Sequence, residues 1–182
     1  MQISEPTEYV VLGLLKEQPM HGYEMFQLIQ GGTLGQIVHV EMSQLYAFLK
    51  KLERLAYIEA ELEHQGTRPP RKIFHLTQTG YAVFQQWLIL PVEKPRDIRI
   101  LFLIKLYFVQ RYLPTQIAYL IEQQIAACKR FLAHLESKHP LLTSKTSDEA
   151  FFDHVVLRSR IHQTRSLLEW MRELQTELVE IY

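Results

Sequence analysis

The sequence lacks several features that mark whole classes of protein. It has a single cysteine, Cys128, which excludes an internal disulfide and a zinc site built from cysteines. No apolar run approaches the roughly 20 residues that a membrane-spanning helix needs. The polar start and the short apolar run after it do not resemble a signal peptide. We therefore expect a cytoplasmic protein without a membrane partner.

The chain has no excess of charge of either sign, because 20 Lys and Arg side chains balance 20 Asp and Glu side chains. Residues 1–90 carry 7 basic and 9 acidic side chains. This balance speaks mildly against binding to nucleic acid, since a domain that binds it usually has a basic surface. Only a local concentration of cations on one face can reverse that conclusion.

Motifs for catalysis and metal binding are also missing. The sequence contains no Gly-rich phosphate loop and no Gly-x-Ser-x-Gly motif. Its histidines do not form a ligand set: His154 and His162 can share a helix face, but a third ligand is lacking. The sequence therefore predicts no enzyme, no cofactor and no metal site.

The N-terminal half contains three helical patterns, two strand patterns and a fourth helical pattern. The expected elements are helices that begin near Ser4 or Thr7, near His21 and near Ser43, strands over 57–63 and 72–76 joined by a loop at 64–70, and a helix capped by Thr77. Residues 33–42 are expected to form an irregular connector. We expect His21 to hydrogen-bond at the start of the second helix and Tyr23 to lie in the core.

This order of elements is that of a winged helix-turn-helix, whose third helix reads DNA. Spacing divides the predicted helix Gln44–Leu55 into an apolar stripe and an opposite, cation-rich face. The predicted DNA contacts on this helix are Ser43, Gln44, Ala47, Lys50, Lys51 and Arg54. Gln44 can pair with an adenine edge, whereas the cations suit phosphates. Taken alone, such a face can equally be a solvated helix surface.

The expected hairpin tip adds a second group of cations. Arg68, Arg71 and Lys72 surround two consecutive prolines, Pro69 and Pro70. A stiff, basic wing is suited to bind the phosphate backbone of the groove next to the third helix. The two cation groups together favour DNA binding over a solvated surface.

Several linked motifs lie in residues 9–90: Leu12-Gly13-Leu14-Leu15, Pro19-Met20-His21-Gly22-Tyr23-Glu24, Ser43-Gln44-Leu45-Tyr46, Pro70-Arg71-Lys72 and His75-Leu76-Thr77. With these motifs the chain resembles the PadR family of bacterial transcription regulators. Residues 96–108 are similar to the start of the helical C-terminal region in the longer-chain branch of that family. The resemblance implies a homodimer that represses by occupying an operator. It also implies that Tyr46 contacts DNA and that Arg71 or Lys72 binds the backbone.

One position departs from the family pattern. The family usually ends its recognition helix with glycine, where this chain has Ala56. A left-handed residue at that point costs alanine on the order of 1 kcal/mol. We therefore expect the helix to end differently, which would change the direction of the wing.

Residues 91–182 read as a helical domain that follows a linker over Pro91–Pro95. The last helix is about 45 Å long by its rise per residue, which exceeds what a small domain can cover. We expect a second subunit to cover its apolar stripe, with a monomeric three-helix bundle as the alternative. The predicted dimer contacts are Leu157, Ile161, Leu168, Met171, Leu174, Leu178 and Ile181.

Aromatic side chains in this half allow two interpretations. Trp87, Phe102, Tyr107, Phe108 and Trp170 can pack as core or line a pocket for a small hydrophobic effector. Members of the resembled family often respond to phenolic acids or other hydrophobic compounds.

The sequence thus predicts a mainly α-helical protein with a small β-hairpin. Residues 1–90 are expected to form the winged helix DNA-binding domain, and residues 91–182 a helical dimerisation and effector domain. The expected partners are double-stranded operator DNA, a second copy of the chain and a small hydrophobic or phenolic effector. Two alternatives stay open: a winged-helix adaptor that binds proteins without DNA, favoured by the near-neutral N-terminal half, and a sensor whose ligand is needed for folding.

Overall fold

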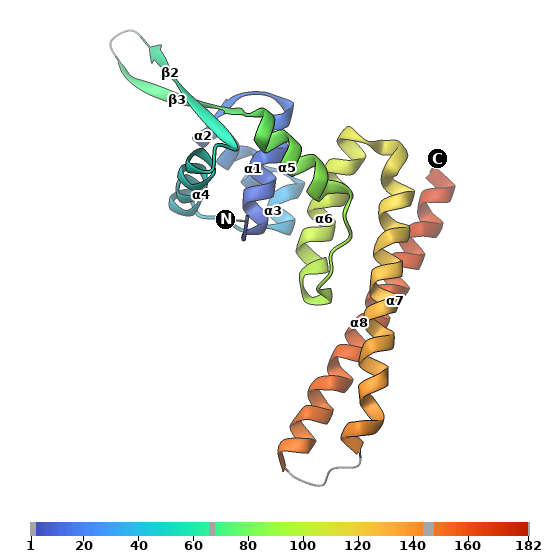
Figure 1. Ribbon diagram of the computed structural model, residues 1–182. Helices are drawn as coiled ribbons and strands as arrows, with labels where there is room; N and C mark the ends of the chain where they lie inside the picture. Colours follow the sequence, from blue (N-terminus) through green and yellow to red (C-terminus); the bar gives the residue numbers. More distant parts are fainter. Residues whose placement is uncertain (1–2, 66–67, 144–147, 182) are drawn as a thin grey trace. The chain divides into compact units, whose positions relative to one another are not determined.

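The computed structural model describes residues 3–65, 68–143 and 148–181, and it describes only the backbone of residues 64–65, 68–69, 139–143, 148–149 and 179–181. The elements are α1 (Pro6–Glu17), β1 (Met20–His21), α2 (Gly22–Gly31), α3 (Thr33–Ile37), α4 (Met42–Arg54), β2 (Ile58–Gln65), β3 (Arg68–Leu76), α5 (Gln78–Ile89), α6 (Pro95–Tyr112), the 3₁₀ turn η1 (Pro114–Gln116), α7 (Ile117–Thr143) and α8 (Asp148–Ile181) (Figure 1). The predicted fold class is confirmed, although the connector expected over 33–42 contains α3. None of the described helices is long and apolar enough to span a bilayer.

The contacts divide the chain into two compact units. Met1–Ile89 and Ile100–Tyr112 form the first unit, and Leu90–Arg99 and Leu113–Tyr182 form the second. The first segment of the N-terminal unit ends at Ile89, and the unit also contains most of α6, which the sequence analysis assigns to the C-terminal domain. The reason is a close approach: a Cβ on Gly13 of α1 would lie 2.2 Å from the Phe108 ring of α6.

Helix α4 begins before the predicted Gln44, because Glu41 and not Ser43 caps it. The Glu41 N–H donates to Oε1 of Gln44 at 3.0 Å, and the Glu41 side chain accepts a bond from the backbone of Gln44. This capping box satisfies two otherwise free donors at the start of the helix. The predicted apolar stripe is confirmed at Leu45, Leu49 and Leu52, which are buried.

The end of α4 contradicts the prediction that alanine would change it. Ala56 has a φ of 55°, the left-handed conformation that glycine takes at this point. The Ala56 N–H donates to the Glu53 carbonyl and the Tyr57 N–H to the Leu52 carbonyl, both at 3.0 Å. These two bonds are the Schellman pattern, so the helix turns into the wing as it would with glycine.

The wing is longer than the sequence predicts, and its strands form a sheet in the order β1-β3-β2. Strand β3 begins at Arg68, inside the expected loop 64–70. The register changes between Glu63, which faces Arg71, and Gln65, which faces Arg68. The two prolines between Arg68 and Arg71 therefore sit at an irregularity, where their missing N–H groups break no regular ladder.

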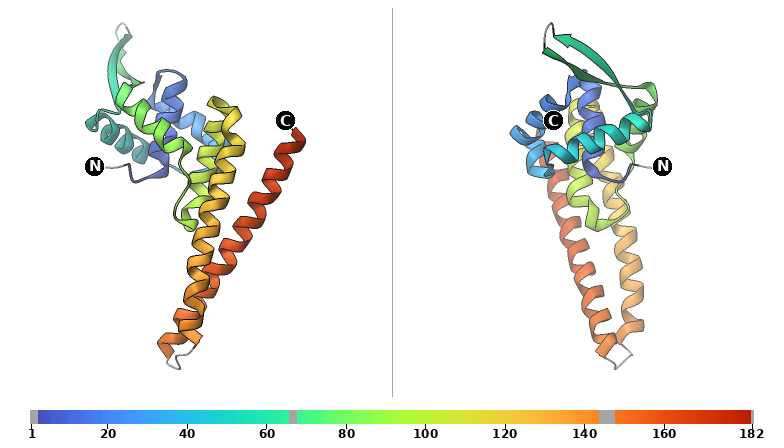
Figure 2. Two further views of the ribbon diagram at one scale, coloured as in Figure 1. Left: turned by 45° about the vertical axis from the view of Figure 1, so that its right-hand side comes forward. Right: turned by 90° about the vertical axis from the view of Figure 1, so that its left-hand side faces the viewer.

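In the second unit, α7 and α8 form an antiparallel pair (Figures 1 and 2). Four predicted dimer residues are buried within this chain: Leu157, Ile161, Leu168 and Met171. The first two pack in a core with Leu135 of α7, against which Phe131 and Leu132 also pack. This stripe therefore has cover inside its own chain, which differs from the expectation that a second subunit supplies it.

The remaining part of the predicted stripe is less covered. Leu174 and Leu178 are half-buried. The side chain of Ile181 lies outside the described residues. The strongly exposed apolar residues of α8 lie at its start instead: Phe151, Phe152, Val155 and Val156.

Candidate nucleic-acid interface

Helix α4 lies beside the hairpin in the first unit (Figure 1). One face of this helix is exposed. Its exposed residues include six of the predicted DNA contacts: Ser43, Gln44, Tyr46, Ala47, Lys50 and Arg54. Ala47, Lys50 and Arg54 line a shallow depression of about 440 Å³ together with Lys51 and Glu53. This arrangement places two exposed cations one turn apart along the helix, a spacing at which both can reach a phosphate backbone.

Lys51 lines the same depression, but its ammonium group is already engaged by the N-terminal part of the chain. Its Nζ lies 2.5 Å from Oε1 of Glu8 and donates to Oγ of Ser4 at 2.9 Å. Glu8 is fully buried, and its other carboxylate oxygen accepts the backbone N–H groups of Ser4 and Glu5. A buried carboxylate without a partner is costly, so Lys51 stabilises the fold by joining α4 to α1.

The side-chain amide of Gln44 already uses one of its hydrogen-bonding groups within the helix. Its Oε1 accepts the Glu41 N–H in the capping box, which leaves the amide NH₂ as the free hydrogen-bonding group. A bidentate pair with adenine uses both the amide oxygen and the NH₂ group. The NH₂ group alone can still donate to an acceptor on a base edge, such as guanine O6 or thymine O4.

The wing is joined to the recognition helix by an ion pair. Nζ of Lys72 lies 3.2 Å from both carboxylate oxygens of Glu53 on α4. Arg71, the neighbouring cation, is exposed. The side chain of Arg68 lies outside the described residues. Of the two described cations of the wing, Lys72 is thus paired with Glu53 and Arg71 is exposed.

The acidic residues of the hairpin share one face of β2. Glu59, Glu61 and Glu63 alternate along the strand and stand opposite His75, Ile73 and Arg71 of β3. Leu62 and Lys72 stand opposite each other in the other set of pairs. Successive side chains of a strand point to opposite faces. These glutamates therefore balance the charge count of the N-terminal half, but they lie on the face of the hairpin opposite to that of Lys72.

A groove at the start of α2 brings together residues that the sequence analysis separates. It has a volume of about 590 Å³ and is lined by His21, Gly22, Tyr23, Glu24, Tyr46, Arg71, Lys72 and Phe74. The side chain of Tyr23 is 57% exposed and that of Tyr46 is 48% exposed. The prediction of Tyr23 as core is therefore wrong: Met25 and Ile29 form the buried face of α2, and Tyr23 falls outside it.

His21 holds this groove in shape. Its Nδ1 lies 2.9 Å from the Lys72 carbonyl oxygen, and its Nε2 lies 3.2 Å from Oε2 of Glu63. Its backbone N–H donates to Oε2 of Glu24 at 2.9 Å. The expected hydrogen bonding of His21 at the start of the second helix is confirmed, and it extends to both strands of the wing.

The aromatic residues considered for an effector pocket are divided between the two units. Trp87 stacks on Tyr9 with ring centroids 3.9 Å apart, and Phe108 packs in the same core with no exposed surface. Phe102 is also fully buried and Tyr107 is half-buried, whereas Trp170 lies on α8 in the second unit. The structure thus brings four of the five residues into one packed unit and leaves Trp170 apart.

A lysine lies inside that aromatic core. Lys105 is 2% exposed, donates to the Trp87 carbonyl oxygen, and has its Nζ 3.8 Å from the centre of the Trp87 ring. Burial lowers the pKa of Lys105 to about 7, because the charged form loses its hydration. The charge of this side chain is thus unavailable to DNA, and its protonation affects the stability of the fold.

An exposed, cation-bearing helix followed by a two-stranded hairpin that carries Arg71 and Lys72 is the arrangement of a winged helix DNA-binding protein. Residues 11–86 match the model of the Transcriptional regulator PadR-like family. Residues 98–178 match the model of the Virulence activator alpha C-terminal region. Residues 11–86 are thus a domain of the PadR-like family of transcriptional regulators, as the motifs predict, and the chain is a DNA-binding transcription regulator.

Characterised relatives extend over almost the whole chain. The negative transcriptional regulator PadR of Bacillus subtilis is 26% identical over 172 residues, which cover 92% of this chain and 94% of the relative. The crystal structure of that regulator with operator DNA is similar with a TM-score of 0.48 at 26% identity, covering 95% of this chain and 99% of the other. Its structure with p-coumaric acid is similar with a TM-score of 0.43 at 24% identity, covering 95% and 98%.

Proposed function

We propose that this protein represses transcription by occupying an operator, with α4 in the major groove and the wing on the adjacent backbone. The observation that carries the proposal is that Lys50 and Arg54 are exposed on α4, whose Glu53 pairs with Lys72 of the wing. Repression is supported by the Bacillus subtilis relative, which is a negative regulator. The adaptor alternative has no comparable support, since the matched family consists of transcriptional regulators.

The cations divide into free and engaged groups. In the part of the chain that the structure describes, Lys50, Arg54 and Arg71 are exposed and have no ion pair. Lys72 can exchange Glu53 for a phosphate, since its ion pair is half-exposed. These four side chains supply affinity that is independent of sequence and sensitive to salt.

The α2 groove adds a place for one phosphate between α2, α4 and the wing. Its lining includes the exposed residues Tyr23 and Tyr46 and the cations Arg71 and Lys72, with Glu24 as the acid among the described residues. The first N–H groups of a helix attract an anion, and α2 begins in this groove at Gly22. We expect the two tyrosine hydroxyls to bind the backbone and so to fix how deep α4 enters the DNA.

Sequence discrimination falls to the first turns of α4. Ser43, Gln44 and Ala47 are exposed there, with Tyr46 beside them. The free NH₂ of Gln44 can donate to a base acceptor, and the methyl of Ala47 suits a thymine methyl.

A homodimer is the assembly that a symmetric operator requires. The apolar surface left for a partner is the start of α8, where Phe151 is 64% exposed and Phe152 is 68% exposed. The neighbouring Val155 and Val156 are exposed as well. A contiguous exposed apolar patch of this kind is typical of a protein–protein contact.

We further propose that a small hydrophobic or phenolic effector relieves repression, as the p-coumaric acid complex of the Bacillus subtilis relative suggests. The protein is expected to act in the cytoplasm without catalysing a reaction. Among the described residues, no group of three or more His, Cys, Asp or Glu side chains can hold a metal ion.

The proposal is tested by footprinting the full chain on DNA from directly upstream of its own gene, with scrambled DNA as the control. We expect protection of two half-sites about one helical turn apart. Tyr23→Phe/Tyr46→Phe should weaken protection of the same bases, whereas Tyr119→Phe, an exposed tyrosine on α7, should leave it unchanged. Absence of binding to either DNA at low salt would refute the DNA assignment.

A further inference from the structure

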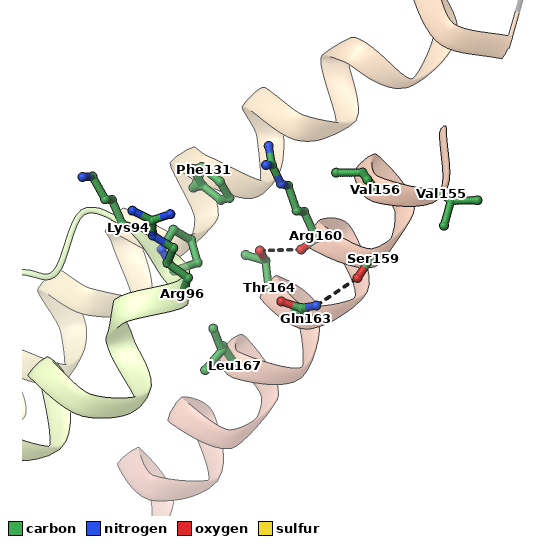
Figure 3. Close-up of a pocket in the computed structure, with 11 residues that line it drawn as sticks. Lys94, Arg96, Phe131, Val155, Val156, Ser159, Arg160, Gln163, Thr164 and Leu167 are labelled. Atoms are coloured by element: carbon green, nitrogen blue, oxygen red, sulfur yellow. Dashed lines mark hydrogen bonds between the residues drawn. The ribbon is translucent and has the colours of Figure 1, made fainter. Parts of the chain in front are cut away.

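A groove in the second unit is ringed by cations. It lies between the start of α6, α7 and α8 and has a volume of about 640 Å³ (Figure 3). Lys94 and Arg96 lie on one side and Arg160 of α8 on the other. No Asp or Glu is among the described residues that line it. This volume is within the range of pockets that hold small molecules, roughly 300–1,000 Å³.

The position of Lys94 and Arg96 is fixed by a buried amide. Gln124 of α7 has no exposed surface, and its Oε1 accepts the Val92 N–H at 2.6 Å. Its Nε2 donates to the Val92 carbonyl at 2.9 Å. This pair of bonds ties the segment before α6 to α7, two residues away from Lys94. The backbone that carries the groove's cations Lys94 and Arg96 is therefore anchored to α7 within the second unit.

Between the cations the wall of the groove is uncharged and partly apolar. Phe131 of α7 and Leu167 of α8 line it, both half-buried, and Val156 lies further along α8. The uncharged polar residues of the wall are Ser159, Gln163 and Thr164. The stretch of α8 from Val156 to Leu167 is about 16 Å long by the helical rise. The groove is therefore elongated, which suits a chain better than a single ring.

The charges of the groove have little compensation within the unit. Arg96 is 79% exposed and pairs with its sequence neighbour Asp97 at 3.4 Å. Lys94 and Arg160 have no ion pair among the described residues and are exposed. A neutral occupant would leave Lys94 and Arg160 without a counter-charge, whereas an anionic head group would bind the cations by charge-assisted hydrogen bonds.

We propose that this groove binds an elongated amphipathic carboxylate, an anion of the fatty-acid type. The carboxylate binds among Arg96, Arg160 and Lys94, and the acyl chain packs on Phe131 and Leu167. The site does not rest on the proposed DNA contacts, which belong to the first unit.

The test is calorimetric titration of the full chain with decanoate and, separately, with decan-1-ol, in the absence of DNA. We expect one decanoate per chain and clearly weaker binding of the alcohol. Arg96→Gln/Arg160→Gln should weaken decanoate binding by at least about tenfold, because two charge-assisted contacts are lost. The matched control Arg158→Gln/Arg172→Gln removes two exposed charges of α8 outside the groove and should bind as the wild type does.

Three results would overturn this assignment: no decanoate binding to the wild type, equal binding of the alcohol, or unchanged binding in Arg96→Gln/Arg160→Gln. Binding that appears only when the protein is diluted to monomers would also overturn it, because a second copy would then be the occupant. Operator binding by both double variants is measured in parallel. Since the titration contains no DNA, its failure is separate from a failure of the repressor proposal.

Discussion

At the scale of single residues, Ala56 shows how the surrounding structure can hold a side chain in a conformation it disfavours. Its φ of 55° is left-handed, and its carbonyl oxygen accepts the hydroxyl of Thr77 at 2.7 Å. The same hydroxyl accepts the Gly80 N–H at 3.0 Å, as expected of a helix cap. The joint between α4, the wing and α5 is thus fixed by several bonds that do not depend on glycine.

Replacing Ala56 with glycine should therefore stabilise the protein without moving the wing. We expect Ala56→Gly to raise the free energy of unfolding by about 1 kcal/mol, because glycine adopts positive φ without the steric cost. The measurement is urea denaturation. The control Ala47→Gly lies inside α4 and should lower the same quantity by about 1 kcal/mol. A loss of stability in Ala56→Gly would contradict this account of the helix end.

Lys105 should make stability depend on pH. Burial lowers its pKa from 10.5 to about 7, so the folded state disfavours the proton that the unfolded chain binds. The free energy of unfolding should therefore fall as the pH drops from about 10 to about 7 and level off below. The contact with the Trp87 ring favours the charged form and reduces this effect.

The check is thermal melting of the wild type and Lys105→Met at several pH values between about 6 and 9. The wild type should gain stability with rising pH relative to the variant, since other titrating groups are common to both. If the melting temperatures of the two proteins change with pH in the same way, Lys105 does not titrate in this range.

At the scale of elements, spacing predicts which face of α4 is buried but not what each polar side chain meets. The period of Leu45, Leu49 and Leu52 is a property of the helix alone, so it can be read from the sequence. The partner of Lys51 is Glu8, which is more than forty positions away along the chain, and no local pattern indicates it. The same holds for Tyr23, whose neighbours in the α2 groove come from α4 and β3.

The joint between α1 and α4 gives a prediction that separates two neighbouring lysines. Lys51→Ala should lower the free energy of unfolding by about 3 kcal/mol, because it leaves the buried Glu8 carboxylate without its cation. Lys50→Ala should change it little, since that side chain is exposed. Urea denaturation of both variants checks this. Lys51→Met in a Glu8→Gln background should recover much of the loss, and failure to do so would point to another cause.

At the scale of the whole molecule, periodicity predicts that a helix face is covered but not which chain covers it. The stripe of α8 that contains Leu157 and Ile161 is covered by α7 of the same chain. Local patterns likewise do not indicate which of the aromatic residues considered for an effector pocket pack together. Phe108 and Trp87 pack in the first unit, whereas Trp170 lies in the second. The order of elements, by contrast, follows from local patterns, and it is the part of the fold that the sequence predicts best.

The exposed start of α8 gives the prediction for assembly. Phe151→Asp/Phe152→Asp should convert a dimer to a monomer, because two charges would be buried in the proposed apolar contact. Light scattering after gel filtration measures the mass, and His162→Asp on the same helix serves as an exposed control. A double variant that stays dimeric would place the interface elsewhere.

The central claim, that α4 carries the DNA contacts, is tested most directly by the salt dependence of operator binding. Fluorescence anisotropy would compare the wild type, Lys50→Ala/Arg54→Ala and the control Lys129→Ala/Arg130→Ala, whose exposed cations lie on α7. We predict weaker binding for the α4 variant, with no change in the control. Because the dimer loses four cations, the slope of log affinity against log salt should be smaller by about 3.6. An α4 variant that binds with the affinity and slope of the wild type would contradict the account.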